Sequence, residues 1–491
     1  MRPARAIRAL AAIAAAALLT AVPWSRAGAA APDPVYPAAQ LADLVAGAMQ
    51  ASAVPGADQT RPFGANPAFM PDWDHDGVFG DAGDYAVENS TQTGTASFRY
   101  PCIAMDGTVT YRTASGGCVP GDRSAPFLTG EATRLRVVDE FGYELAATLF
   151  VPGEARRAPG HRLPGVVIAD GAQASMQTFY MYAMTLAEEG IVVLSFDFAG
   201  QGQSEDGGTG FFHDFQGGGV GGDCHPTRPC METEDMVRWF TGAPIVRNVS
   251  GPQSPTRGAH DPALNPRDPA LGVLDTSRIG LAGQSMGGLT VSNYLWYLPS
   301  GRGADGRPLP AVRAAVGLSG FAPASAAVPY QMQTADLDIP GRDAHNGFVD
   351  STDGPTGTKA YYDELRQGGR GGGALELIVI ESGSHGDTSN ATRLNGLPVP
   401  RTTWANAVST AYAAAWMGCH LSSRGDACAA AVAPLPHLSR AQASEYDADG
   451  PAGPAPSRCI TVPDKATLEQ AYDPARFAAA VLGRPSYDCT P

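Results

Sequence analysis

One stretch of the sequence decides the fold, and it runs Arg278-Ile279-Gly280-Leu281-Ala282-Gly283-Gln284-Ser285-Met286-Gly287-Gly288. It begins as a short apolar strand, passes through Gly-x-Ser-x-Gly, and continues into the helix-compatible segment 289–295. A tight strand-to-helix turn requires glycine at Gly283 and Gly287, because strand and helix approach closely there and the serine between them takes a strained conformation. We therefore expect Ser285 to stand at the carboxyl end of a strand. A serine hydroxyl is a weak nucleophile, so it needs a histidine base, a carboxylate to orient that base, and donors for an oxyanion.

The first 29 residues have the features of a secretory signal peptide. Three arginines precede the apolar run 9–22, and residues 27–29 form a small-x-small cleavage site. A membrane anchor is the alternative, but the run is shorter than the ~20 residues that a spanning helix needs. Removing residues 1–29 takes the formal charge from −15 to −19, because they contain four arginines and no acid. Such a charge argues against nucleic acid and anionic membranes as partners.

All eight cysteines lie in the predicted mature chain, and an even number in a secreted protein suggests disulfides. Sequence does not fix their connectivity, but they fall in four local clusters. The simplest pairing is Cys102–Cys118, Cys224–Cys230, Cys419–Cys428 and Cys459–Cys489. A metal held by Cys224, His225 and Cys230 is the alternative, but the spacing is not Cys-x-x-Cys and the compartment is oxidising.

Residues 30–125 contain much Gly, Pro, Asp and Ser without a long helical period, which predicts an irregular N-terminal extension. Acids at alternate positions followed by glycine let oxygens converge on a hard cation, for which calcium is the natural candidate. The sequence departs from an EF-hand because the twelfth position is Gly83 rather than Glu and no flanking helices are evident. We therefore expect a structural calcium loop, with a solvated acidic turn as the alternative. The candidate ligands are Asp72, Asp74, Asp76, Asp81 and Asp84.

From Arg134 onward the pattern is that of an α/β domain. A β-hairpin is expected over 134–151, followed by strands at 166–169 and 191–196 with a helix over 176–189 between them. Strand, helix and strand at these lengths form a βαβ unit, so the sheet is parallel here. The alternation continues with a helix over 231–240, the nucleophile strand and its helix, strands at 312–318 and 330–334, a helix over 359–366, a strand at 375–380 and a helix over 404–417.

These elements predict one doubly wound, mostly parallel domain over residues 126–420. Two insertions interrupt it, the glycine-rich segment 207–223 and the proline-rich segment 251–275. Both are expected beside the strand ends where doubly wound sheets bind ligands, so they would shape or cover the site; a surface loop is the alternative. The tail 421–491 is expected to pack on the outside of the domain and to be cross-linked by disulfides.

With these motifs in this order, the chain resembles a secreted bacterial α/β-hydrolase, similar to the dienelactone-hydrolase, lipase and cutinase-like members. The resemblance covers roughly Arg134 to Cys419. Besides the serine motif it rests on Asp197-Phe198-Ala199-Gly200-Gln201-Gly202-Gln203-Ser204, which is similar to the family's D-x-R-G-x-G-x-S loop with alanine in place of arginine. Leu274-Asp275-Thr276-Ser277-Arg278-Ile279 is similar to the family's lead-in to the nucleophile strand.

The resemblance implies a chain order of nucleophile, acid and histidine. His385 lies just beyond the late strand at 375–380, where the family's histidine loop belongs, whereas His345 comes too early. The acid is expected a few residues past the strand at 330–334 and shortly before a proline, which favours Asp338. Asp336 and Asp343 remain alternatives.

The oxyanion hole of such a protein needs two backbone N–H groups. One comes from the residue after the nucleophile, which is Met286. The other comes from the loop after the first central strand, where Asp170-Gly171-Ala172 replaces the family's His-Gly-x. Ala172 is therefore the expected second donor, and Gln173 is the alternative.

The resemblance implies an extracellular serine hydrolase that cleaves carboxylic esters of small molecules, lipids or polyesters through an acyl-enzyme. Neither a metal nor an organic cofactor is expected to take part in that chemistry, and neither nucleic acid nor stable membrane insertion is expected. A serine peptidase or acyltransferase on the same fold is the alternative within enzymes. A non-catalytic binding protein of the same fold is the alternative outside them.

Overall fold

The computed structural model describes residues 70–78, 81–88, 90, 93–103, 109–113, 118–119, 129–153, 155, 160–171, 174–205, 231–249, 254, 260–303, 306–320, 327–335, 361–362, 364–367, 373–380, 393–394, 397–398, 403–422, 444–447 and 457–462. The predicted signal peptide and the insertion at 207–223 lie outside these residues.

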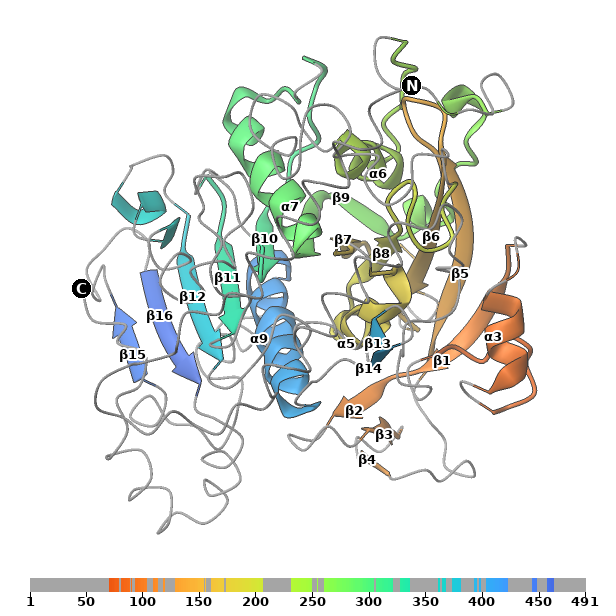
Figure 1. The fold of residues 1–491 in the computed structure, drawn as a ribbon, viewed down its shortest axis with the longest axis horizontal. Coiled ribbons are helices and arrows are strands. Elements are labelled where there is room, and N and C mark those ends of the chain that lie inside the picture. Colours follow the sequence, from red (N-terminus) through yellow and green to blue (C-terminus); the bar gives the residue numbers. More distant parts are fainter. Residues whose placement is uncertain are drawn as a thin grey trace, which may run out of the picture.

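An eleven-stranded mixed sheet forms the centre of the fold, in the order β1-β5-β6-β8-β7-β9-β10-β11-β12-β16-β15 (Figure 1). All neighbours from β8 to β16 pair in parallel, and the remaining pairs are antiparallel. The predicted α/β class with a mostly parallel sheet is therefore confirmed. The strands of this sheet are β1 (Thr95–Arg99), β5 (Thr129–Val138), β6 (Glu144–Val151), β7 (Leu163–Ala169), β8 (Val192–Phe196), β9 (Leu274–Gln284), β10 (Ala314–Leu318), β11 (Tyr330–Ala335), β12 (Leu375–Ile380), β15 (Ser444–Asp447) and β16 (Ser457–Val462).

Helices cover both faces of the sheet (Figure 1). Each face has its own hydrophobic core, which shows which helices lie on it. The helices α6 (Met231–Thr241) and α7 (Met286–Tyr297) pack in one core, and α5 (Tyr180–Glu188) and α9 (Thr403–Leu421) pack in the other. Consecutive strand residues point to opposite faces, so Val167 packs in the first core and Val166 in the second. Burial on both faces explains why these strands are continuous apolar runs in the sequence.

The β-hairpin at the start of the domain forms as predicted, with β5 beginning earlier, at Thr129. Its turn has a simple cause: Asp139 Oδ1 accepts hydrogen bonds from the N–H groups of Phe141 and Tyr143 at 2.9 and 2.8 Å. Gly142 completes the turn at φ +87°, which glycine adopts without steric cost.

The N-terminal extension is less irregular than expected. β1 pairs with β5 and extends the sheet, and β2 (Pro101–Ile103), β3 (Val109–Arg112) and β4 (Cys118–Val119) form a small second sheet. A helix, α3 (Ala82–Glu88), follows the acidic loop, although no flanking helix was expected there. Its seven residues are too few to show a helical period in the sequence.

The described residues add detail to two further expectations. In the tail, β16 pairs in parallel with β12, and β15 pairs antiparallel with β16 at the sheet edge. The described residues of segment 251–275 lie at two places: Asn265 Nδ2 donates to Val138 O at 2.7 Å, at the carboxyl end of β5, and the Leu163 N–H donates to Val273 O at 2.7 Å, at the amino-terminal ends of β7 and β9. The second placement follows from chain direction, since the residues that lead into β9 must enter at the end opposite Ser285.

Strand order also identifies the place where a ligand crevice is expected. From β7 the chain passes to β8 on one side, and the next strand, β9, lies on the other side of β7. Doubly wound sheets bind ligands at the carboxyl ends of strands where the order reverses in this way. The reversal between β7 and β9 therefore points to residues just after Ala169 and Gln284.

The described part of the chain contains no helix that is long and apolar enough to cross a membrane. Cys419, near the end of α9, is disulfide-bonded. The predicted partner, Cys428, lies outside the described residues, so the pairing stays a prediction.

Candidate functional site

Ser285 occupies the turn between β9 and α7. Its backbone has φ +54° and ψ −115°, a combination that a residue with a Cβ rarely adopts. The turn is held by two backbone hydrogen bonds, from the Ser285 N–H to Leu318 O at 2.8 Å and from the Leu289 N–H to Ser285 O at 3.1 Å. The Ser285 side chain does not cap α7. The predicted strand, turn and strained serine are therefore confirmed, and the hydroxyl is not used by its own helix.

Glycines surround this serine because backbone segments touch there. A Cβ on Gly283 would lie 2.3 Å from Gly287 O, and one on Gly287 would lie 2.2 Å from Ala169 O. A third glycine was not singled out in the sequence: a Cβ on Gly320, which follows β10, would lie 2.0 Å from Ser285 O. Neighbouring Ser319 also has a positive φ, +46°. The turn over residues 283–287 that holds Ser285, called the nucleophile elbow below, thus packs between the ends of β7 and β10.

The first candidate oxyanion donor, the N–H of Met286, is at the amino end of α7. Helix N-termini present unpaired N–H groups and the positive end of the helix dipole, so they favour developing negative charge. The second candidate, Ala172, and its alternative Gln173 lie outside the described residues. The described residues before them, Asp170 and Gly171, directly follow β7 beside the elbow.

The structure does not test the predicted acid and base. Asp338, His385 and the alternatives all lie outside the described residues. The strands that precede them are described: β11 ends at Ala335 and β12 at Ile380. Because both run parallel to β9, their carboxyl ends lie on the same edge of the sheet as Ser285. The alternatives are His345, Asp336 and Asp343.

The Asp197–Ser204 loop forms a closed turn on the same edge. Asp197 is fully buried and accepts hydrogen bonds from the N–H groups of Met176 at 2.6 Å and Gln203 at 2.8 Å. Burial raises the pKa of Asp197 to about 7, although those two N–H groups favour its ionised form. The loop needs Gly202, at φ +50°, because a Cβ there would lie 2.2 Å from the Asp197 carboxylate. These contacts explain why the loop keeps Asp197 and Gly202, and none of them involves position 199, where Ala199 replaces the arginine of the similar family motif.

Among the described residues, a cavity of about 630 Å³ lies between β5 and residues 260–266, at the carboxyl end of β5 and separated from β9 by β6, β8 and β7 in the strand order. Thr133, Arg136, His260 and Asn265 are among the residues that line it. None of the predicted site residues contributes to it.

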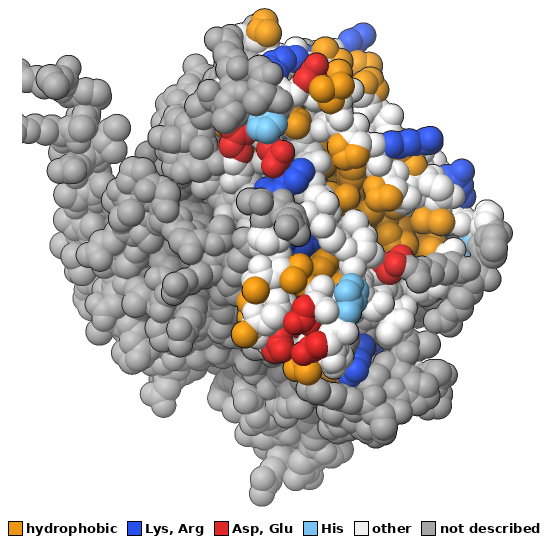
Figure 2. All heavy atoms as spheres, turned by 90° about the vertical axis from the view of Figure 1, so that its right-hand side faces the viewer, with side chains coloured by type: hydrophobic (Ala, Val, Ile, Leu, Met, Phe, Trp, Pro, Cys, Tyr) orange, Lys and Arg blue, Asp and Glu red, His pale blue; other side chains and the backbone are white. Residues whose placement is uncertain are grey.

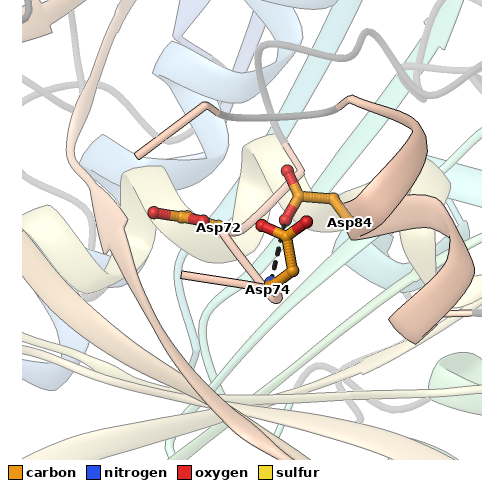
Figure 3. Close-up of side chains that lie close together, drawn as sticks. All are labelled: Asp72, Asp74 and Asp84. Carbon is orange, nitrogen blue, oxygen red and sulfur yellow. Dashed lines mark hydrogen bonds between the residues drawn. The ribbon is translucent and has the colours of Figure 1, made fainter. Parts of the chain in front are cut away.

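The predicted calcium loop brings its five acids together. The carboxylates of Asp72, Asp74 and Asp84 have oxygens within 4.8 Å of one another, and so do those of Asp74, Asp76 and Asp81. Asp74 belongs to both groups, and its carboxylate faces that of Asp84 from α3 (Figure 3). Acidic side chains gather on the face of the molecule that carries α3 and β5 (Figure 2).

Glycines and backbone N–H groups shape this loop. Gly77, at φ +84°, makes the turn that the sequence predicts and donates its N–H to Asp72 Oδ2 at 3.0 Å. Gly83 occupies the position of the EF-hand glutamate for a steric reason, since a Cβ there would lie 1.8 Å from Asp74 Oδ2. Asp84 is fully buried, and its Oδ1 accepts hydrogen bonds from the N–H groups of Trp73 and Asp74, which partly compensate its charge.

A buried ion pair joins α3 to the central sheet. Glu88, at the end of α3, is fully buried and lies 3.6 Å from Arg134 Nε of β5. Its Oε1 also accepts hydrogen bonds from Gln177 Nε2 and Tyr180 OH, both at 2.8 Å. Arg134 bonds in turn to the Gln203 side chain. The acidic loop is therefore connected through α3 to the loop after β8.

No model of a known protein family matches this sequence, and no significantly similar curated protein is found. The functional argument consequently rests on the residues and the geometry described above.

Proposed function

We propose that the protein is an extracellular serine hydrolase with an α/β-hydrolase fold that cleaves carboxylic esters through an acyl-enzyme intermediate. One observation carries the proposal: a serine with φ +54° at a Gly-x-Ser-x-Gly turn, at the carboxyl edge where strand order reverses. A strained, glycine-enclosed serine that is not used to cap its helix has no structural explanation of its own. Export from the cell is supported by the features of residues 1–29.

In the proposed mechanism, Ser285 Oγ attacks the ester carbonyl carbon while His385 accepts its proton. The N–H groups of Met286 and Ala172 donate to the oxyanion of the tetrahedral intermediate. His385 then returns the proton to the leaving alcohol, and Asp338 keeps the imidazole in the required tautomer and orientation. A water molecule then attacks the acyl-enzyme through the same two steps, which frees Ser285 and releases the carboxylic acid.

The proposal predicts that a fluorophosphonate probe labels Ser285 covalently. Labelling requires an activated serine, so heat-unfolded protein and Ser285→Ala should not react. Mass spectrometry of the digested adduct identifies the residue. A folded protein that fails to react would contradict catalysis and favour a binding protein of the same fold.

Turnover of esters with increasing acyl length, beside a polyester film and a peptide amide, then separates the enzyme alternatives. Hydrolysis of amides in preference to esters would favour the peptidase. Product formation only when an acceptor alcohol is added would favour the acyltransferase.

We also propose that Asp72, Asp74, Asp76, Asp81 and Asp84 hold a structural calcium ion. The supporting observation is that two groups of three carboxylates converge and share Asp74. Carboxylates this close repel one another unless a cation lies among them. Oxygen ligands from a flexible loop are those that calcium prefers.

Chelation is expected to lower the melting temperature, and millimolar calcium is expected to restore it. A hundredfold excess of calcium over its dissociation constant would stabilise the fold by about 2.7 kcal/mol. Asp74→Ala should remove the response in differential scanning calorimetry. Asp261→Ala is the matched control, because Asp261 is an exposed acid outside the loop. Equal melting temperatures of the wild type with chelator and with calcium would contradict the site.

A further inference from the structure

We propose that Asp170 is a positioning residue for the acyl-transfer site. Together with Gln201 it holds the end of β7 against the nucleophile elbow. The inference rests on the proposed function, since it concerns how the oxyanion loop of that site is fixed.

The backbone of Asp170 and Gly171 touches the elbow on both sides of Ser285. β7 and β9 are paired so that Ala169 lies opposite Gly283. A Cβ on Gly287 would lie 2.5 Å from Asp170 O, and one on Gly171 would lie 2.1 Å from Gln284 Oε1. A shift of residues 170–171 would therefore displace Gln284 and Gly287, which lie on either side of the nucleophile in the sequence.

The Asp170 side chain ties this backbone to a different loop. It is fully buried, and Gln201 Nε2 donates a hydrogen bond to Asp170 Oδ1 at 3.4 Å. Gln201 is itself buried and belongs to the closed turn after β8, where its N–H donates to Phe198 O at 3.0 Å. The segments after β7 and β8 are thus linked through the Asp170 and Gln201 side chains.

The surroundings of Asp170 favour its neutral form. Burial raises the pKa of the Asp170 carboxyl well above its usual range, and the acids Asp197 and Glu232 raise it further. The N–H groups of Phe198 and of Asp170 itself act in the opposite direction. These two acids come from the loop after β8 and from α6, and neither offsets a negative charge on Asp170.

A neutral carboxyl suits this position for an electrostatic reason. Negative charge develops on the substrate oxygen during attack, and an ionised Asp170 at low local dielectric would repel it. Within the described residues, Asp170 Oδ1 accepts from Gln201 and Asp170 Oδ2 has no hydrogen-bond partner, so a negative charge on this carboxylate would be incompletely compensated.

The test compares Asp170→Asn, Asp170→Ala and Gln201→Met in the full mature chain. Asp170→Asn keeps the shape and polarity of the neutral acid, so its kcat should stay within about tenfold of the wild type. Asp170→Ala and Gln201→Met remove the link and should lower kcat about a hundredfold with little change in KM, as expected for lost positioning. Asp268→Asn is the control, since burial raises the pKa of Asp268 to about 7 far from the elbow. Circular dichroism confirms folding.

The protonation state is read separately by infrared difference spectroscopy. At neutral pH the wild type should show a protonated-carboxyl band that Asp170→Asn lacks. Overturning results are a folded Asp170→Ala with wild-type kcat, an Asp170→Asn as impaired as Asp170→Ala, or no loss of the band. A wild type that neither hydrolyses esters nor reacts with fluorophosphonate would instead overturn the proposed function and, with it, the positioning role.

Discussion

Ser285→Ala is expected to reduce ester hydrolysis by roughly a million-fold in kcat while leaving the fold unchanged. Members of a catalytic triad act as a unit, so losing the nucleophile alone costs about as much as losing all three. The fold should persist because alanine keeps the Cβ that the turn already accommodates, and the lost hydroxyl does not cap α7. Steady-state kinetics with a soluble ester and far-ultraviolet circular dichroism measure the two effects.

Ser277→Ala is the matched control for this variant. Ser277 is an exposed serine on the same strand, near the end opposite Ser285, so its removal should leave kcat unchanged. Substantial esterase activity in folded Ser285→Ala would refute the assignment of the nucleophile. Equal losses in both variants would point to damage to β9 instead of a lost nucleophile.

Asp338→Asn is expected to lower kcat about 10⁴-fold, the loss that results when a triad histidine is held in the wrong tautomer. Asp336→Asn and Asp343→Asn should cause much smaller losses, because a neighbouring loop acid does not orient the base. The measurement is kcat with one soluble ester for all three variants, with circular dichroism as the folding control. A larger loss in Asp336→Asn would move the assignment to that residue.

Strong local signals in the sequence predicted the part of the fold that positions Ser285. Buried parallel strands are continuous apolar runs, so β7, β8 and β9 could be predicted. The glycines of the elbow are required by contacts close to the serine in sequence, so the turn and α7 could be predicted as well. The acidic loop was predictable for the same reason, since alternate acids and Gly77 lie within one short stretch.

Features that depend on packing between distant segments could not be predicted. Gly320 matters only because the end of β10 meets Ser285 O. The link from Asp170 to Gln201 joins two loops through a buried contact. The seven-residue α3 is too short to show a period, and β16, with the sequence Ser-Arg-Cys-Ile-Thr-Val, lacks a continuous apolar run. Their places in the fold are set by Arg134 and β12. Asp338 and His385 lie outside the described residues, so their roles stay predictions.

The buried acids near the elbow have a consequence for the medium in which the protein works. Burial raises the pKa of Asp197 to about 7 from a usual value of 3.8, and it raises the pKa of Asp170 as well. Folding should therefore take up protons between these values, since the unfolded chain releases protons that the native chain retains. Because the native state then binds more protons than the unfolded state, stability falls as pH rises through this window and is recovered on acidification. A mildly acidic medium should therefore stabilise the folded protein through buried carboxyl groups, the side chains whose protonation usually destabilises proteins at low pH.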